Sequence, residues 1–175
     1  MTRKVVVTPW SPGWAAKYHH LASQLNGVLG EELVSIHHIG STSVPGMAAK
    51  PIIDIMPVVH RIEVVDVLTP QLEALNMVAK GEYGIPGRRY FVGCTDGERS
   101  HHVHIFGAGS SEIERHLALP AYLCSHPDEA LAYSRLKLQL AQQFPEDIEG
   151  YIAGKNDFVE ALEKRALAWW GANNG

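Results

Sequence analysis

Apolar and polar positions follow two different rhythms along this chain, and the rhythm changes near residue 110. Before that point, short apolar runs of strand length are interspersed with stretches of helical spacing. Strands are expected at residues 5–8, 33–39, 52–59, 89–93 and 101–106. Helices are expected at about residues 12–29, where Ser11 and Pro12 form a helix start, and at 62–75, where Pro70 predicts a break or a kink.

The final third of the chain is predicted to be helical throughout. Helices are expected at roughly 112–124, 127–143 and 146–170. We therefore predict one domain over residues 1–175, with a mixed α/β part at about 1–110 and a helical part at about 111–171. The fold class that follows is α+β.

The segment 36–58 carries the strongest chemical signal. Gly40, Ser41 and Thr42 break the strand 33–39, and such a turn can cradle phosphate oxygens with backbone N–H groups and hydroxyls. The alternative is a capping turn, because Ser and Thr also favour such positions structurally. Asp54 stands alone in an apolar strand, which is costly unless the carboxylate is paired, hydrogen-bonded or bound to a metal.

Alternation along the strand 101–106 places His102 and His104 on one face and His101 on the other, apolar face. If this strand neighbours that of Asp54, two imidazoles and one carboxylate outline a metal site. Asp54, His102 and His104 are thus candidate ligands of a divalent cation, with His favouring Zn²⁺, Mn²⁺ or Fe²⁺ over Mg²⁺. Alternatively, the histidines hydrogen-bond Asp54 or a phosphate directly, or they only line a polar face.

Basic residues near this segment are candidates for phosphate binding. Lys50 lies at the entrance of the second motif strand, and its alternative is a surface lysine. Of the neighbours Arg88 and Arg89, only one can face the site, where it would grip a phosphate or carboxylate bidentately. The alternative for either arginine is a solvated charge at a strand edge.

Composition limits the classes of partner. A 46% hydrophobic and 19% charged chain with net charge −4 is a globular protein without a global basic field, so nucleic acid is not expected as a partner. The apolar runs are too short for a membrane span, and the two cysteines, Cys94 and Cys124, do not form a disulfide framework. We expect a cytoplasmic bacterial protein; its oligomeric state is left open.

The motif HIGSTSVPGMAAKPIIDI resembles the GrpB family of the nucleotidyltransferase superfamily, whose members also occur fused to dephospho-CoA kinase. The resemblance extends to Arg88–Arg89, to the histidine strand, and to the helical pairs Tyr133/Lys137 and Tyr151/Lys155. It implies a mixed β-sheet with helices packed on one face, followed by a C-terminal helical segment. It also gives Tyr133, Lys137 and Lys155 a substrate-binding role, although spacing alone predicts tyrosines on the core with lysines at its rim.

The resemblance implies metal-assisted nucleotidyl or phosphoryl transfer to a small acceptor, with Asp54 as the catalytic residue and Mg²⁺, Mn²⁺ or Zn²⁺ as cofactor. One departure matters: Met56 stands where the superfamily has a second metal carboxylate, and a thioether is a poor ligand for a hard cation. Two alternatives therefore stand beside the transferase. One is a catalytically degenerate module that binds a nucleotide or a CoA precursor, and the other is a different Asp/His metal-dependent reaction.

Overall fold

The computed structural model describes residues 4–174 and divides into two compact units. The sheet unit comprises Gly13–Ile39 and Ile52–Ile113. The helical unit comprises the N-terminal residues to Pro12, the segment Gly40–Pro51, and the chain from Glu114 onward. The segment with the Gly-Ser turn therefore groups with the C-terminal helices, although in sequence it lies between two strands of the sheet. The prediction of one domain stays a prediction.

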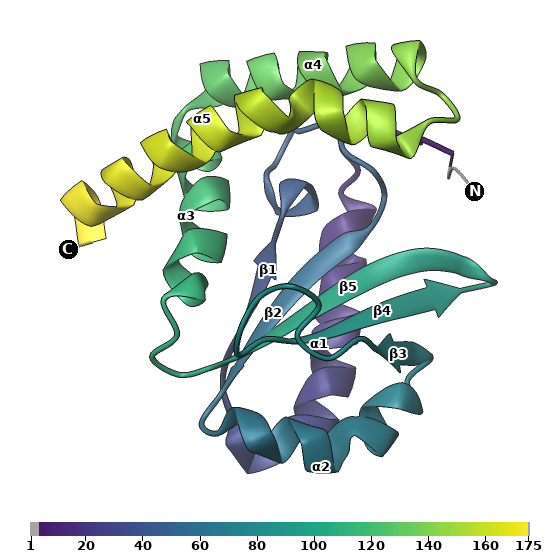
Figure 1. The fold of residues 1–175 in the computed structure, drawn as a ribbon, viewed down its shortest axis with the longest axis vertical. Helices are drawn as coiled ribbons and strands as arrows, with labels where there is room; N and C mark the ends of the chain where they lie inside the picture. The colour runs from purple at the N-terminus through teal and green to yellow at the C-terminus, as the bar shows by residue number, and fades with distance from the viewer. Residues whose placement is uncertain (1–3, 175) are drawn as a thin grey trace. The chain divides into compact units, whose positions relative to one another are not determined.

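The sheet unit is built on five strands in the order β1-β2-β5-β4-β3 (Figure 1). The strands are β1 (Leu33–Ile39), β2 (Ile53–Val59), β3 (Met77–Ala79), β4 (Arg89–Thr95) and β5 (Glu98–Gly107). β2 and β5 run parallel, while the other three neighbouring pairs are antiparallel. The sheet is thus mixed, and the predicted α+β fold class is confirmed.

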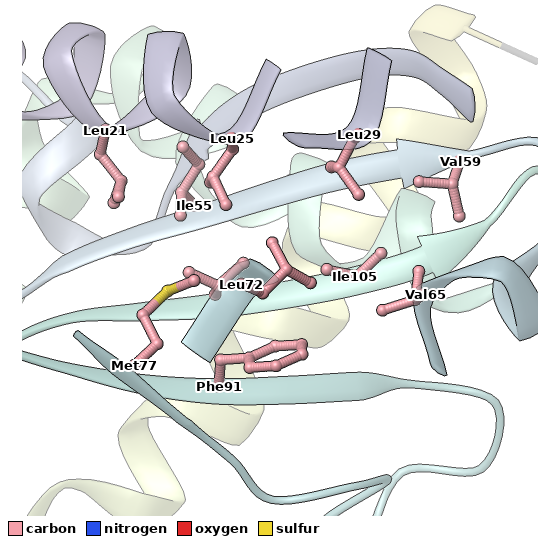
Figure 2. Close-up of a cluster of buried hydrophobic side chains, with 11 residues drawn as sticks. Leu21, Leu25, Leu29, Ile55, Val59, Val65, Leu72, Met77, Phe91 and Ile105 are labelled. Atoms are coloured by element: carbon pink, nitrogen blue, oxygen red, sulfur yellow. The ribbon is translucent and has the colours of Figure 1, made fainter. Parts of the chain in front are cut away.

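Two helices, α1 (Gly13–Leu29) and α2 (Ile62–Glu73), pack on one face of this sheet. Leucines at helical spacing on α1 and the buried face of α2 meet alternate residues of the strands (Figure 2). The buried cluster consists of Leu21, Leu25, Leu29, Ile55, Val59, Val65, Leu72, Met77, Phe91, Val103 and Ile105. Because side chains alternate along a strand, Asp54 and Met56 of β2 point to the face opposite Ile55.

The β4–β5 hairpin turns on Asp96 and Gly97. Both residues have positive φ, 53° and 82°, and Thr95 pairs directly with Glu98. Positive φ at both central positions is typical of the type I′ turn, whose twist matches that of antiparallel strands. Asp-Gly is one of the dipeptides that favour this turn. This turn fixes the register that places Gly93 opposite His101.

Residue 93 must be glycine because the cross-strand neighbour His101 leaves no room for a β-carbon. A β-carbon at this position would overlap the imidazole ring of His101, which is held by a hydrogen bond of 2.8 Å between its Nδ1 and the Ser100 hydroxyl. Gly93→Ala should therefore lower the free energy of unfolding by about 2 kcal/mol, measured by urea denaturation. Adding His101→Ala should recover part of the loss. Gly27→Ala on α1 is the matched control, because a β-carbon there meets no atom within 4 Å; losses of equal size in the two alanine variants would contradict the overlap.

The helical unit contains α3 (Glu112–Ser125, from its third residue), α4 (Pro127–Gln143) and α5 (Ile148–Asn174), with α4 lying along α5 (Figure 1). One buried cluster joins all three helices to Val44 and Met47 of the segment Gly40–Pro51. A second cluster, at the other end of α4, contains Val5, Leu140, Ile148 and Tyr151. The predicted helices 112–124, 127–143 and 146–170 are confirmed to within a few residues.

Three sequence expectations need correction. Residues 5–8 form no strand, since only Thr8 makes an isolated bridge, to Ala49. Pro70 does not break α2, which continues for three more residues to Glu73. The short strand β3 was not predicted, because three residues are too few to show a strand pattern.

No helix within residues 4–174 combines the length and apolar character that a bilayer crossing needs.

Candidate functional site

Asp54 lies at the centre of a polar cluster on the sheet face opposite α1 and α2. In the parallel register of β2 and β5, Asp54 stands directly beside His102. Nε2 of His104 lies 3.0 Å from Oδ1 of Asp54, and Nδ1 of His102 lies 3.5 Å from the same oxygen. The Asp54 side chain is 28% exposed. The structure thus brings together the three residues that alternation and strand adjacency predicted to share a face.

Arg88 fixes the hydrogen-bonding state of His104. Its Nη1 lies 3.2 Å from Nδ1 of His104, and because a guanidinium can only donate, that ring nitrogen accepts. The proton of the neutral imidazole is then on Nε2, from which it is donated to Asp54. Arg88, His104 and Asp54 therefore form a directed chain of hydrogen bonds.

The Asp54 carboxyl is held in its ionised form. Burial by itself would raise its pKa, but hydrogen bonds from His102 and His104, with the electrostatic attraction of the two rings, outweigh burial. The net result is a pKa well below the usual range for aspartate. A carboxylate that stays charged at all moderate pH values can bind a cation or a donor, but it is a weak proton acceptor.

As arranged, this cluster is a hydrogen-bonded set and does not fit a metal ion directly. Both nitrogens of His104 are engaged, one by Arg88 and the other as the donor to Asp54, so neither offers a lone pair to a cation. Throughout residues 4–174, no group of three or more His, Cys, Asp or Glu side chains has the arrangement of a metal site. Met56 is fully buried, and its thioether supplies no hard oxygen ligand. Ligation by Asp54, His102 and His104 would require His104 to leave Arg88, and it stays a prediction.

The structure separates the roles of the two adjacent arginines. Arg88 is 6% exposed and is one of the donors in the Asp54 cluster. Arg89 instead forms an ion pair with Asp66 of α2, with Nε 2.7 Å from Oδ1 of a half-exposed carboxylate. Arg88 therefore belongs to the Asp54 cluster, and Arg89 forms a surface contact between β4 and α2.

The Gly-Ser turn forms a single turn of 3₁₀ helix, η2 (Ser41–Ser43), in the helical unit. Gly40 has φ 72°, a conformation that favours glycine, and its carbonyl accepts a hydrogen bond from the Ser43 hydroxyl. Thr42 is buried, and the Ser41 side chain is hydrogen-bonded to the Tyr133 hydroxyl. The turn is therefore anchored to α4 through Ser41.

Three lysines of the helical unit gather around two buried tyrosines; we call Lys50, Lys137, Lys155, Tyr133 and Tyr151 the lysine cluster. Nζ of Lys137 lies 4.3 Å from the ring centre of Tyr133. Nζ of Lys50 and of Lys155 lie 5.3 Å and 5.7 Å from the ring centre of Tyr151. Such distances permit cation–π attraction. The cluster unites lysines from α4, α5 and the segment Gly40–Pro51.

Lys137 is the unexpected member of this cluster. It is only 3% exposed, and its Nζ has no hydrogen-bond partner in the described part of the chain. Burial, with the charges of Lys155 and Lys50, lowers its pKa to about 7. Burial also raises the pKa of Tyr133 to about 12, although the hydrogen bond to Ser41 opposes the rise.

Spacing alone predicted Lys137 at the rim of the core, and this was wrong. The missed signal was the series Tyr133, Lys137 and Leu140, which at steps of four and three residues follows one buried stripe of α4. Lysines are rarely fully buried, so the stripe by itself would not identify this one as a core residue.

Residues 4–165 match the family model described as GrpB protein. The chain is 44% identical over 173 residues to UPF0157 protein YqkA of Bacillus subtilis. The match covers 98% of this chain and 50% of that protein. It thus spans about half the length of this relative. A dephospho-CoA kinase of Mycolicibacterium paratuberculosis is 27% identical over 94% of the chain, in a match that covers 46% of the kinase.

Solved structures extend the likeness to the fold. The crystal structure of GrpB from Enterococcus faecalis matches with a TM-score of 0.90 and 42% identity, covering 94% of this chain and 99% of the other. The Cid1 poly(U) polymerase matches with a TM-score of 0.55 over 77% of this chain and 43% of its own, at 13% identity, which supports likeness of fold alone. The chain therefore belongs to the GrpB family and has a nucleotidyltransferase-like fold.

Proposed function

We propose that this protein binds a nucleotide or another phosphorylated small molecule, with a phosphate group held by the lysine cluster. The observation that carries the proposal is Lys137, a buried amino group whose Nζ has no hydrogen-bond partner within residues 4–174. Leaving such a group unsatisfied costs several kcal/mol, roughly, which a bound anion would offset. Lys50 and Lys155 add positive charge at the same place.

The Gly-Ser turn supports the same proposal. Ser41 reaches the lysine cluster through its hydrogen bond with Tyr133, so the turn and the lysines form one polar region of the helical unit. Hydroxyls and lysines together are suited to phosphate oxygens, which accept several charge-assisted hydrogen bonds. The Cid1 polymerase, whose fold is similar, was solved with Mg and 3′-dATP bound.

A second candidate function is transfer of a nucleotidyl or phosphoryl group, and the ionised Asp54 favours it. A carboxylate kept charged on a β-strand is the group that such chemistry uses to position a cation. The directed contact from His104 holds the carboxylate oxygen in place.

The test is a thermal-shift panel on metal-stripped protein with ATP, GTP, CTP, UTP and dephospho-CoA, each with and without Mg²⁺, Mn²⁺ or Zn²⁺. A compound that binds the native state raises the melting temperature by mass action. We expect a nucleotide-dependent rise in the wild type and its loss in Lys137→Met. Lys164→Met, which changes an exposed lysine of α5, should keep the rise.

The outcomes separate the candidates. A rise that also needs metal and disappears in Asp54→Asn would support transfer, and release of pyrophosphate would then be measured directly. A rise that survives both changes would support a binding module without turnover. A rise with Zn²⁺ or Mn²⁺ alone would support a different Asp/His reaction, and no rise with any nucleotide would contradict phosphate binding.

A further inference from the structure

The lysine cluster carries an inference about how its ligand is held and released. Its members come from α4, α5 and the segment Gly40–Pro51, all in the helical unit. The groups that act on or contact Lys137 are Lys50, Lys155 and Tyr133. Tyr151 lies beside the other two lysines, and Glu163 of α5 acts on Tyr133. The charges that act on Lys137 itself are the two lysines, and both oppose its positive charge.

This geometry disfavours the protonated amine while the site is empty of anion. The Lys137 amine is buried, finds no acceptor for its N–H bonds among the described residues, and lies near two like charges. Each of these features stabilises the neutral form relative to the ammonium ion. The nearby tyrosine hydroxyls do not supply a negative charge, because burial raises the pKa of both.

An anion reverses this balance. A phosphate oxygen beside Nζ supplies the missing acceptor and an opposite charge, and both favour the ammonium ion. We propose that binding of a phosphate group to the lysine cluster is coupled to the uptake of one proton by Lys137, so that the site holds its anion at neutral and acidic pH and releases it as the pH rises. This inference rests on the proposed phosphate binding. In the step, the neutral amine takes a proton from solvent and the resulting ammonium donates to the anion.

The coupling predicts a specific pH dependence. The free amine titrates at about 7, so below that pH the protonation of Lys137 should change the affinity for the anion only slightly. Above it, affinity should fall by up to tenfold, roughly, per pH unit, because each binding event must draw a proton from a more basic solution. At pH 7 about half a proton should be taken up per anion bound, rising toward one at higher pH.

The test is isothermal titration calorimetry with inorganic tripolyphosphate in buffers of different ionisation enthalpy, at pH 6, 7 and 8. The slope of the observed enthalpy against the buffer enthalpy counts the protons taken up. Lys137→Arg is the matched variant, because arginine keeps its charge at all these pH values. The protonation of the ligand itself contributes equally to both proteins. We expect the wild type to take up more protons than Lys137→Arg at pH 7 and 8, and the difference to vanish at pH 6.

Equal proton counts in the wild type and the arginine variant would overturn the coupling while leaving phosphate binding in place. No heat and no thermal shift with tripolyphosphate would overturn phosphate binding itself, and the coupling with it. If Lys137→Arg fails to fold, NMR titration of the Lys137 side chain in the wild type gives the same answer. Saturation with tripolyphosphate should then raise the pKa of Lys137, and an unchanged titration would overturn the coupling.

Discussion

Lys137→Met is expected to raise the free energy of unfolding by on the order of 3 kcal/mol at pH 6, while removing anion binding. Methionine has a similar shape and no charge to desolvate. Lys137 is buried, and the part of the chain that the structure describes supplies no hydrogen-bond partner to offset that burial. A substitution that stabilises the fold and removes a ligand site is the usual sign that a residue serves function at the expense of stability.

The gain should shrink as the pH rises. The pKa of Lys137 is lowered in the folded protein to about 7, below its ordinary value of 10.5. Between these two values the unfolded chain holds a proton that the folded protein has released, so the wild type becomes more stable with increasing pH. Below about pH 7 both states hold the proton and the full cost of the buried charge remains. The advantage of Lys137→Met should therefore be largest at pH 6 and smaller at pH 9.

Urea denaturation at pH 6, 7.5 and 9, followed by circular dichroism, checks this expectation. Lys164→Met is the control, because a change at an exposed lysine of the same unit should alter stability by less than about 0.5 kcal/mol at each pH. A Lys137→Met protein less stable than the wild type at pH 6 would mean that the ammonium ion is well satisfied in the folded state, against the contacts described above.

Arg88→Met should lower the free energy of unfolding by about 3 kcal/mol, whereas Arg89→Met should lower it by less than about 1 kcal/mol. Besides its contact with His104, Arg88 donates from Nε to the Glu82 carbonyl at 3.1 Å and from Nη2 to the Tyr83 carbonyl at 2.8 Å. Its guanidinium also lies 4.5 Å from the ring centre of Tyr90. The buried side chain thus ties the segment before β4 to the sheet, and methionine replaces none of these bonds.

Arg89 makes the ideal comparison because it is the next residue and has an ion pair of its own. Its partner Asp66 is 55% exposed at the side chain, so solvent screens the pair. Urea denaturation of both variants measures the difference, and ¹⁵N NMR of the His104 ring reports the tautomer that Arg88 selects. Similar losses in the two variants, or an unchanged His104 tautomer in Arg88→Met, would contradict the role assigned to Arg88.

Local pattern was enough to predict most elements and the shared face of His102 and His104. The alternation of β5 placed His102 and His104 on one face, since that property depends only on the geometry of a strand. The Asp96-Gly97 turn likewise depends on a local preference, since both residues readily adopt positive φ. The family resemblance, from the motif around Gly40 and Asp54, predicted the mixed sheet with helices on one face, and that fold class is confirmed.

What depended on contacts between distant segments could not be predicted in the same way. Adjacent arginines are equivalent until a neighbour is known, and only the sheet shows that Arg88 meets His104 while Arg89 meets Asp66. The grouping of Gly40–Pro51 with the C-terminal helices likewise depends on packing across the chain. The sequence by itself determined which residues could share a face, because alternation and helical spacing are properties of the local backbone. Only the tertiary structure decided that Lys137 is buried among other lysines, because burial and charge depend on what the rest of the chain brings alongside.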